Sequence, residues 1–278
     1  MDFLTEKDLA TTWQETMRVQ KFANNVQGFD QVRKDINDWR ENNINYSKLP
    51  NGIRLKLLEK RIYKNYGIPV KHSENKPLVS HFLLSSDHSV FCPGIIKNKA
   101  EYTEKAGHNY LAFLPDIEEI EQYHQRKPNQ LIIIDFPLNI IRDCVSGLEY
   151  VPQLLKPLLE TDRAPRFHQP VGKITPMMKT IIKQIWEHPY QGAIAQMYLE
   201  AKVLELVSLQ LFQLLQQEKQ EPRQFTLNPK EIEQVYEAEA ILQNNYLDPP
   251  SIVELAQKIG LDRMKLQQGF REVFNVTP

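Results

Sequence analysis

Residues 263–271 carry the side chains whose types and spacing most clearly suggest chemistry. Basic and amide side chains recur there on one face of a predicted helix. Arg and Lys can reach phosphate groups, and Gln can make paired hydrogen bonds to an adenine edge in the major groove. The pattern is therefore suited to contact with double-stranded DNA through one helix face, formed by Arg263, Met264, Lys265, Gln267, Gln268 and Arg271.

Two short helices joined by a glycine turn would position this face. Ser251, with Glu254 three residues later, predicts a capping box at the start of the first helix. Gly260 stands at the C-cap position, where a left-handed residue is needed, and Asp262 can cap the second helix. These signals predict a helix-turn-helix, whose core is formed by Leu255, Ala256, Gly260, Leu261, Leu266 and Phe270.

A helical module that touches no DNA is the alternative for the same pattern. Paired amphipathic helices with a glycine turn occur in many such proteins, and a polar helix face is usually only solvated. Residues 222–278 carry six Lys and Arg against eight Asp and Glu, a net charge of -2. Because attraction to phosphates supplies most of the non-specific affinity, this region alone should bind DNA weakly.

The chain upstream changes character twice. A helix is expected over about residues 5–25, followed by a polar loop or broken helix. Between about residues 53 and 136, short apolar runs separated by turn formers predict an antiparallel sandwich or barrel. Within it, the run LIIIDF has no alternation and predicts a strand buried on both faces. From Pro137 onward the period is helical, and the longest helix is expected from Ala193 to about Gln220.

The long helix suggests how the chain is divided. At 1.5 Å per residue it would extend about 40 Å, so it can serve as a connector or as the surface of a homodimer. Its predicted apolar stripe contains Ile194, Met197, Leu204, Val207, Leu211 and Leu214. We expect an α+β fold with an antiparallel β-rich sandwich or barrel over 1–170, a helical connector over 171–221, and an all-α helix-turn-helix region over 222–278. The stretch EPRQFTLNP marks the last boundary.

Composition and missing motifs exclude several classes of protein. Apolar residues make up 41% and charged residues 25%, as in globular proteins, and the net charge is only -1. No run approaches about 18 apolar residues and the N-terminus has no signal-peptide pattern, so we expect a cytoplasmic chain without a membrane partner. Cys92 and Cys144 lie far apart, which argues against a disulfide framework or a zinc finger. Without GxSxG, HExxH, P-loop or GxGxxG motifs, we expect no catalytic residue, metal site or cofactor.

The end of the chain resembles a known family. Residues 251–278, with the preceding EAEAILQNNYLDPPS, look like the first half of the DNA-binding domain of AraC-type transcription regulators. The resemblance rests on an LA-x3-GL core and an F-x3-F-x-V-x-P ending. Upstream, ITPMMKTIIKQIWEHPYQGAIAQMYLEAKVLELVSLQL is similar to the segment before that domain in the pyochelin-regulator (PchR) branch. Together the two stretches cover about residues 171–278.

The resemblance implies a ligand-responsive regulator. Its cupin-like, β-rich domain over 1–170 would sense a small-molecule effector, and its helix-turn-helix region would bind promoter DNA. The family's first recognition helix enters the major groove, so Met264, Gln267 and Gln268 would face base edges. Arg263, Lys265 and Arg271 would meet phosphates. Members of the branch commonly respond to an iron-loaded siderophore and control iron-uptake genes. The family continues past the final Thr-Pro with a second helix-turn-helix, so we expect a truncated chain. The alternative is an effector-binding or protein-interaction module whose shortened DNA-reading half does not bind DNA.

The sequence does not single out effector-binding residues. Histidines at 72, 81, 88 and 124 fall in the strand region without metal-ligand spacing, and surface or core positions are their default. A sheet-lined pocket in which His81, His88 or His124 contacts an iron complex is the minor alternative. The aromatic residues that could line such a pocket are expected to pack in the core: Phe82, Phe91, Tyr102, Tyr110, Phe113 and Tyr123. The acidic run DIEEIEQYHQ is expected to form a solvated edge or loop.

Overall fold

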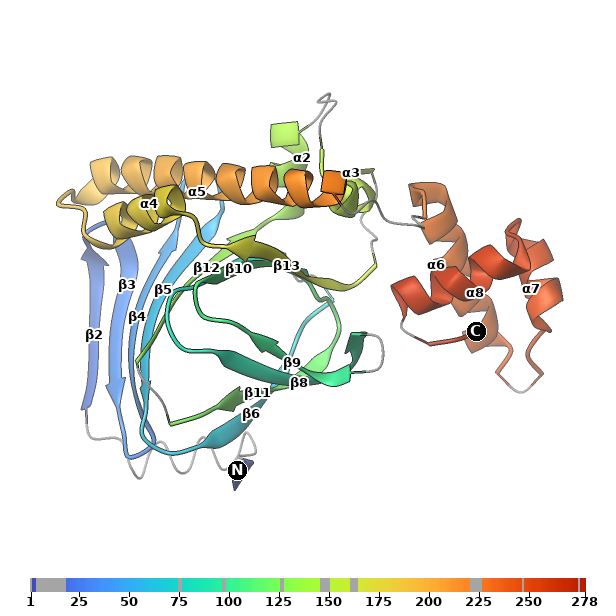
Figure 1. Ribbon diagram of the computed structural model, residues 1–278, viewed down its shortest axis with the longest axis horizontal. Helices are drawn as coiled ribbons and strands as arrows, with labels where there is room; N and C mark the ends of the chain where they lie inside the picture. The colour runs from blue at the N-terminus through green and yellow to red at the C-terminus, as the bar shows by residue number, and fades with distance from the viewer. Residues whose placement is uncertain are drawn as a thin grey trace.

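The structure is a computed structural model with an α+β fold, as predicted. It consists of two β-sheets, a layer of helices and a C-terminal group of helices (Figure 1). No helix among the described residues is both long and apolar enough to cross a membrane. The structure describes residues 2–3, 19–74, 77–96, 99–125, 128–145, 151–160, 165–220, 227–246, 248–274 and 276–278.

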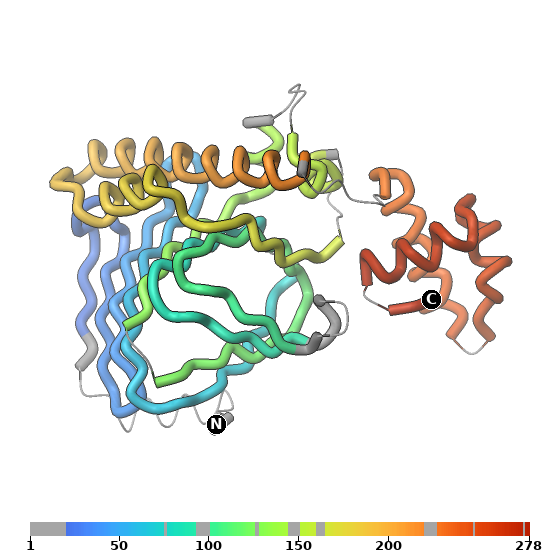
Figure 2. The backbone as a smooth tube through the Cα atoms, in the orientation of Figure 1, coloured from blue at the N-terminus to red at the C-terminus, as the bar shows by residue number. Residues whose placement is uncertain are grey.

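Two sheets of largely antiparallel strands form a barrel. The larger sheet contains β2 (Val19–Val26), β3 (Phe29–Ile36), β4 (Arg40–Lys48), β5 (Arg54–Ile62), β7 (Leu78–Leu83), β10 (His108–Phe113), β12 (Asn129–Phe136) and β13 (Phe167–Lys173). The smaller sheet contains β1 (Asp2–Phe3), β6 (Tyr66–Lys71), β8 (His88–Ile96), β9 (Lys99–Glu104) and β11 (Glu118–Tyr123). Their strand orders are β13-β10-β7-β12-β5-β4-β3-β2 and β1-β6-β11-β8-β9, and only β1 and β6 pair in parallel within these residues. Figure 2 shows the smaller sheet curving around to face part of the larger one.

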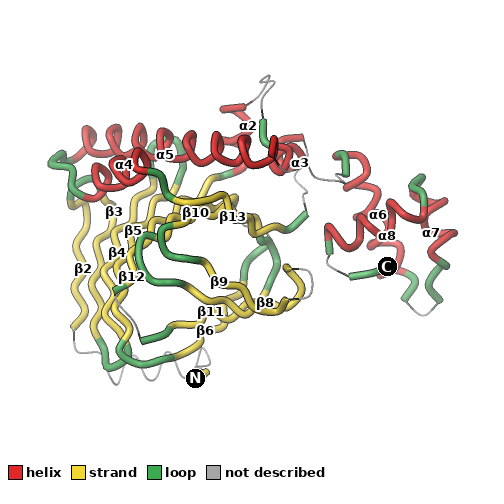
Figure 3. The backbone as a smooth tube through the Cα atoms, in the orientation of Figure 1, coloured by secondary structure: helices red, strands yellow, loops and turns green. Residues whose placement is uncertain are grey.

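Helices cover the outer face of the larger sheet, as Figure 3 shows in red above the yellow strands. They are α2 (Leu138–Val145), the short 3-10 turn η1 (Gln153–Leu155), α3 (Lys156–Glu160), α4 (Pro176–Trp186) and α5 (Gly192–Gln220). Thr175 caps α4, because its hydroxyl accepts a hydrogen bond from the backbone N–H of Met178 at 3.2 Å. These helices agree with the predicted helical region, but β13 is a strand within it, over Phe167–Lys173, and corrects that part of the prediction.

The larger sheet has one apolar and one polar face because side chains alternate along each strand. The apolar face packs beneath the helices and forms the main core, which includes Leu55, Phe82, Leu111, Ile132, Ile134 and Phe136. From the helices, this core receives Met178, Ile181, Ile185, Leu199, Val203 and Leu206. The run LIIIDF in β12 is buried on both faces, as predicted, apart from the half-buried Ile133.

The stripe of α5 that faces the sheet differs from the predicted one. Ile194 and Met197 are 66% and 70% exposed, and Leu204 is 38% exposed. Val207 and Leu214 are buried as predicted, and the other buried positions are Ala195, Leu199, Val203, Leu206 and Gln210. Apolar residues occur on two sides of this helix, so periodicity alone did not identify the packed side. The buried face also contains the amide of Gln210, a polar residue that an apolar pattern does not predict there.

Strands β2, β3 and β4 correct the sequence prediction for residues 19–48, which placed a helix to about residue 25 and a loop or broken helix after it. Gln27 and Gly28, with φ of 50° and 77°, form the two-residue turn between β2 and β3, and positive φ at both positions suits a tight hairpin. Polar side chains of these strands pair with one another, as Arg33 and Asp35 do at 2.6 Å. Because these residues are mostly polar, their sequence did not show the apolar pattern from which a strand is predicted. The rest of the predicted first helix, before residue 19, lies outside the described residues.

The β2–β3 turn packs directly on α5. A Cβ built on Gly28 would lie 2.5 Å from the Cβ of Ala195, so only glycine permits this approach. The amide of Gln196 donates to the carbonyl of Gly28 and to the hydroxyl of Ser47 at 2.9 Å. These contacts fix the start of α5 on the sheet.

The C-terminal helices form their own core. They are α6 (Pro229–Asn244), α7 (Ile252–Ile259) and α8 (Arg263–Val273), and their most buried residues include Ile232, Val235, Ala238, Leu255, Leu266 and Phe270. Asn228 and Ser251 each make a complete capping box, with Glu231 and Glu254 respectively. The predicted boundary at residues 221–229 lies mostly outside the described residues, and the three-part domain division stays a prediction.

Candidate functional site

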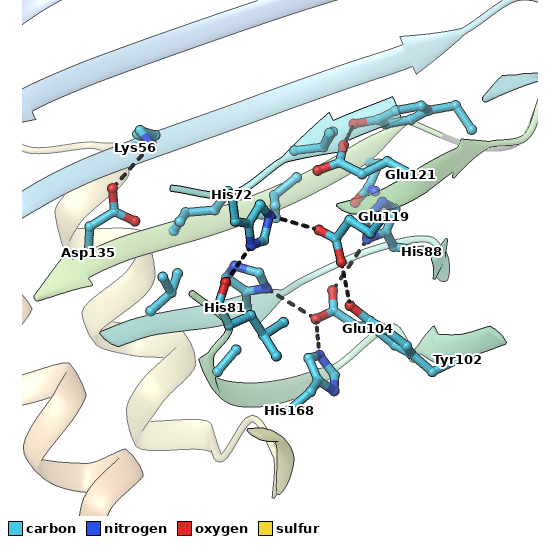
Figure 4. A pocket seen from close by; sticks show the side chains of 18 of the residues that line it. Lys56, His72, His81, His88, Tyr102, Glu104, Glu119, Glu121, Asp135 and His168 are labelled. Carbon is cyan, nitrogen blue, oxygen red and sulfur yellow. Dashed lines mark hydrogen bonds and ion pairs between the residues drawn. The ribbon is translucent and has the colours of Figure 1, made fainter. Parts of the chain in front are cut away.

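A polar cavity of about 210 Å³ lies inside the barrel, between the two sheets. Strand alternation directs side chains from both sheets into this lumen. Figure 4 shows charged and aromatic side chains converging there from opposite walls. The ionisable groups that line it are Lys56, Lys60, His72, His81, His88, Tyr102, Glu104, Glu119, Glu121, Tyr123, Asp135 and His168.

Glu104, on β9, is the centre of this cavity. Its side chain is 3% exposed and accepts hydrogen bonds from three imidazoles (Figure 4). Oε1 lies 3.1 Å from Nδ1 of His81 and 2.8 Å from Nε2 of His168, and Oε2 lies 3.4 Å from Nδ1 of His88. These histidines come from β7, β13 and β8, so one carboxylate ties strands of both sheets together.

The electrostatics of this cluster favour a charged pair. Burial by itself raises the pKa of Glu104, but the charge of His81 and hydrogen bonds from three histidines outweigh it and hold that pKa well below its usual value. Burial likewise lowers the pKa of His81, yet attraction to Glu104 and the hydrogen bond between them produce a net rise. Glu104 and His81 therefore form an ion pair inside the barrel.

A second cluster joins His72, Glu119 and Tyr102. Nδ1 of His72 lies 2.8 Å from the carbonyl of Leu114, and its Nε2 lies 3.0 Å from Oε1 of Glu119. A carbonyl only accepts, so Nδ1 carries a proton, and the contact between Nε2 and Glu119 requires another. Whichever partner holds that proton, the His72–Glu119 pair has no net charge. Burial, and then the neighbouring Glu119, raise the pKa of Tyr102, whose hydroxyl donates to Glu119 at 3.3 Å.

A third cluster holds Lys60, Tyr123 and Glu121. The ammonium of Lys60 donates to the hydroxyl of Tyr123 at 2.9 Å, and that hydroxyl donates to Glu121. Burial lowers the pKa of Lys60, while the pKa of Glu121 falls because attraction to Lys60 and other cations outweighs the effect of burial. Asp135 pairs with Lys56 at 3.2 Å. Each carboxylate in the lumen thus has a cationic or proton-sharing partner.

Two buried polar atoms in the cavity wall have no hydrogen-bond partner among the described residues. They are Nε2 of His88 and Oδ1 of Asn129. Nδ1 of His88 already contacts Glu104, so only Nε2 of that ring is left to bond a ligand, and the amide oxygen of Asn129 is an acceptor. Unsatisfied buried polar atoms are costly, and a bound molecule with hydrogen-bonding groups, including an N–H or O–H for Asn129, would satisfy them.

The described histidines and acids do not form a metal site. No group of three or more His, Cys, Asp or Glu in the part of the chain that the structure describes has the arrangement to hold a metal ion. Three of the imidazoles in the lumen contact oxygens of Glu104 instead. These side chains therefore give the cavity a polar lining.

Sequence reasoning named only part of this cavity, and only as its minor alternative. Of the histidines in that alternative, His81 and His88 line the lumen, whereas His124 is not part of its wall. The cavity is also lined by His72, Tyr102 and Tyr123, which were expected at the surface or in the core. Glu104, Glu119, Glu121 and His168 were missed. The run DIEEIEQYHQ contains strand β11, in which Glu119 is 7% exposed, so its expected solvated edge or loop is wrong for that side chain. Period-two spacing of Glu119, Glu121 and Tyr123 was the available signal.

The second candidate site is the helix pair α7–α8. Gly260 has φ of 73° at the C-cap of α7, and Asp262 accepts a hydrogen bond from the backbone N–H of Lys265 at 2.8 Å. Leu255, Ala256, Leu266 and Phe270 are at most 3% exposed, and Leu261 packs against the same core. The turn and buried side of the helix pair therefore match the arrangement that a helix-turn-helix needs.

The predicted DNA-contact residues differ in exposure. Arg263, Met264 and Arg271 are exposed, whereas Gln267 and Gln268 are half-buried. Lys265 is held within the helical unit, because its ammonium lies 2.6 Å from Oε1 of Glu231. The six side chains thus share α8, but Lys265 is already neutralised by a carboxylate of α6. Their role in binding DNA stays a prediction.

Comparisons with known proteins identify a family. The family described as "Regulatory protein PchR N-terminal domain" matches residues 41–227. Regulatory protein PchR of Pseudomonas aeruginosa is 31% identical over 100 residues, which are 36% of this chain and 33% of that relative. The match therefore spans about a third of the relative's length.

Solved structures show a weaker likeness. A ToxT structure from Vibrio cholerae has a TM-score of 0.35 and 9% identity, covering 81% of this chain and 96% of that chain. A single-residue variant of apo ToxT, also from Vibrio cholerae, has a TM-score of 0.36 and 11% identity, covering 81% and 95%. An oxalate decarboxylase from Lactobacillus farciminis has a TM-score of 0.28 and 13% identity, covering 47% and 40%. Similarity at this level supports no functional argument.

The family match covers most of the barrel as well as the helices packed on it. It begins within β4 and ends after α5, and it includes the whole lumen described above. It also confirms the resemblance to an AraC-type regulator of the PchR branch. The chain belongs to the family of the regulatory protein PchR N-terminal domain.

Proposed function

We propose that this chain is a cytoplasmic, effector-responsive transcription regulator of the AraC type rather than an enzyme. The effector occupies the barrel lumen, and helix α8 reads promoter DNA. The observation that carries the proposal is the polar cavity in the family-matched barrel, where His88 and Asn129 each present an unpaired buried polar atom. Such a cavity with a few convergent polar groups is a natural small-molecule site.

The chemistry of the lumen limits which class of molecule can be the effector. Since its charges are already paired, it favours a molecule without net charge that hydrogen-bonds to Nε2 of His88 and donates a hydrogen bond to Oδ1 of Asn129. An iron-loaded siderophore is the proposed effector, with family membership as its support. The cavity of about 210 Å³ is below the range of roughly 300–1,000 Å³ that holds drug-sized ligands. One polar arm of the complex would therefore enter the lumen while the remainder stays at its mouth.

Calorimetry tests the effector assignment. Ferric pyochelin is expected to release or absorb heat on binding the 278-residue chain, and iron-free pyochelin to bind more weakly. In His88→Asn, the new amide can still donate to Glu104 but cannot replace Nε2. Losing one buried hydrogen bond should weaken ferric pyochelin binding roughly tenfold.

His108→Asn is the matched control. His108 is half-buried, its Nδ1 lies 3.1 Å from the carbonyl of Ala106, and it does not line the cavity. This variant should bind within twofold of the parent. If neither form of pyochelin gives heat, the siderophore assignment is contradicted. If His88→Asn and His108→Asn bind ferric pyochelin with equal affinity, the lumen is not its binding site.

Fluorescence anisotropy tests the DNA half of the proposal. The chain is titrated against randomised duplex DNA over a salt series, followed by selection of bound sequences. Binding that falls steeply with salt is expected from phosphate contacts. The double variant Gln267→Ala with Gln268→Ala should lose sequence selection while keeping the salt dependence, because base contacts specify and phosphate contacts position.

A module that binds effector but not DNA is the second candidate. The net charge of -2 over residues 222–278 and the ion pair of Lys265 with Glu231 favour it. Absence of salt-sensitive binding in the anisotropy experiment would support this candidate, and calorimetry would then define the function.

A homodimer through α5 also belongs to the proposal. Ile194 and Met197 are the most exposed apolar side chains described on this helix, and both lie away from the sheet. Analytical ultracentrifugation of the parent and of Met197→Lys tests it. A dimer that dissociates in the variant is expected, whereas monomers at all concentrations would contradict it.

A further inference from the structure

A second cavity, of about 260 Å³, lies on the opposite face of the larger sheet from the lumen. Strands β7, β10 and β12 form its floor, while α2, η1 and α5 form its walls and roof. None of the lining residues is charged. We take as its mouth the exposed part of its lining, which lies on α5, where Leu204 is 38% exposed and Ser208 is exposed.

The wall of this cavity is almost entirely hydrocarbon. Only two of its side chains are polar, and both hydroxyls already donate elsewhere: Ser80 to the amide oxygen of Gln210 at 2.5 Å and Ser208 to the carbonyl of Glu205 at 2.8 Å. A buried water needs two to four polar partners, which this wall does not supply. The cavity therefore favours apolar contents over water.

The apolar cavity and the lumen lie back to back across a single sheet. Along β7, Leu78 and Ser80 face the apolar cavity, whereas Val79 and His81 face the lumen. Along β12, Asp135 faces the lumen and Phe136 faces the apolar cavity. The two cavities share strands but no lining residue, so they can take ligands of different chemistry.

We propose that the apolar cavity is a second ligand site, which takes a small uncharged molecule such as a substituted aromatic hydrocarbon. An engineered apolar cavity of about 150 Å³ binds benzene, so about 260 Å³ accommodates a ring with a short alkyl chain. A charged molecule is excluded, because burying an unpaired charge in hydrocarbon costs far more than the contacts return. Occupancy would fill space between α5 and the sheet.

Methyl NMR of the full chain with n-butylbenzene tests this site. Saturable shifts are expected in the methyl groups of Ile140, Ile141 and Leu155, which line the cavity. Ser208→Leu places a larger side chain at the mouth and should weaken binding at least tenfold. Ala201→Leu is the matched control, because Ala201 is exposed on the same helix but does not line the cavity. It should bind within twofold of the parent.

Two outcomes would overturn the proposal. One is the absence of saturable shifts up to the solubility limit of n-butylbenzene, with xenon under pressure also failing to shift the same methyl groups. The other is equal binding by Ser208→Leu and Ala201→Leu when circular dichroism shows both variants folded. His88→Asn should leave n-butylbenzene binding unchanged, which separates this site from the effector site in the lumen.

Discussion

Replacing Glu104 by glutamine is expected to destabilise the barrel, and to do so most at mildly acidic pH. Glu104 receives three imidazole contacts, at 2.8, 3.1 and 3.4 Å, with only 3% of its side chain exposed. Hydrogen bonds to a charged group contribute about 1.5–3 kcal/mol each, and the longest contact contributes least. Glutamine keeps one acceptor oxygen but turns an N–H donor toward His81, His168 or His88. The expected loss is about 2–4 kcal/mol near pH 6.

The pH dependence follows from the two shifted pKa values. The raised pKa of His81 contributes stability that is fully present below its unfolded value near 6.5 and is lost as pH rises through the folded value. The depressed pKa of Glu104 contributes stability that is present above about 4.5 and is lost as pH falls through the folded value. Both contributions coexist between about pH 4.5 and 6.5. The effect of Glu104→Gln should therefore shrink between pH 6 and pH 9.

Urea denaturation at pH 6, 7.5 and 9 measures this effect. The difference between the losses at pH 6 and pH 9 reports the raised pKa of His81, at about 1.4 kcal/mol per unit. Glu118→Gln, on the exposed side of β11, is the matched control, since its side chain is 75% exposed and its change should stay below about 0.5 kcal/mol. A loss in Glu104→Gln that is small, or equal at every pH, would refute the ion pair.

Three further predictions concern other parts of the chain. Gly28→Ala should cost about 2–4 kcal/mol in thermal denaturation because a Cβ adds left-handed strain and a clash with α5, whereas Gly107→Ala, with open space around it, should cost only about 1–2 kcal/mol. In DNA titrations, Arg263→Ala should reduce the salt slope by about 0.9, and Lys265→Ala by less, because α6 already neutralises that ammonium. As the sole cysteine of a variant, Cys92 should resist a thiol reagent at pH 8 until urea is added, since burial, and then a nearby carboxylate, raise its pKa to about 12.

Local signals explain why the C-terminal helices could be predicted closely. Ser251 with Glu254, Gly260 and Asp262 act within one or two helical turns, and the structure places each of them at the expected cap. Where the information is contained in a few adjacent residues, a single sequence supplies it.

The lumen could not be predicted because its contacts join distant residues. Glu104 meets His168, which is 64 positions away, and Lys60 meets Tyr123, which is 63 positions away. Register between strands decides these meetings, and a single sequence does not specify it. The buried face of α5 was hard to predict for the same reason. The side-chain amide of Gln210 hydrogen-bonds to Ser80 and Asn109 within the core, so a polar residue lies on the buried face of the helix.

The two faces of the larger sheet explain how the lumen can retain so many ionisable groups. The main hydrophobic core lies on the helix-covered face, so the free energy of apolar burial arises there and the lumen need not supply it. Buried ion pairs are rarely more stabilising than apolar residues of equal volume, so stability alone does not account for the paired carboxylates. The proposed binding of a polar molecule in the lumen would account for them. Strand β7 carries His81 on the lumen face and Ser80 on the other, and Ser80 bonds Gln210 of α5. A ligand that displaces β7 would therefore change the hydrogen bond between Ser80 and Gln210, which connects this strand to α5.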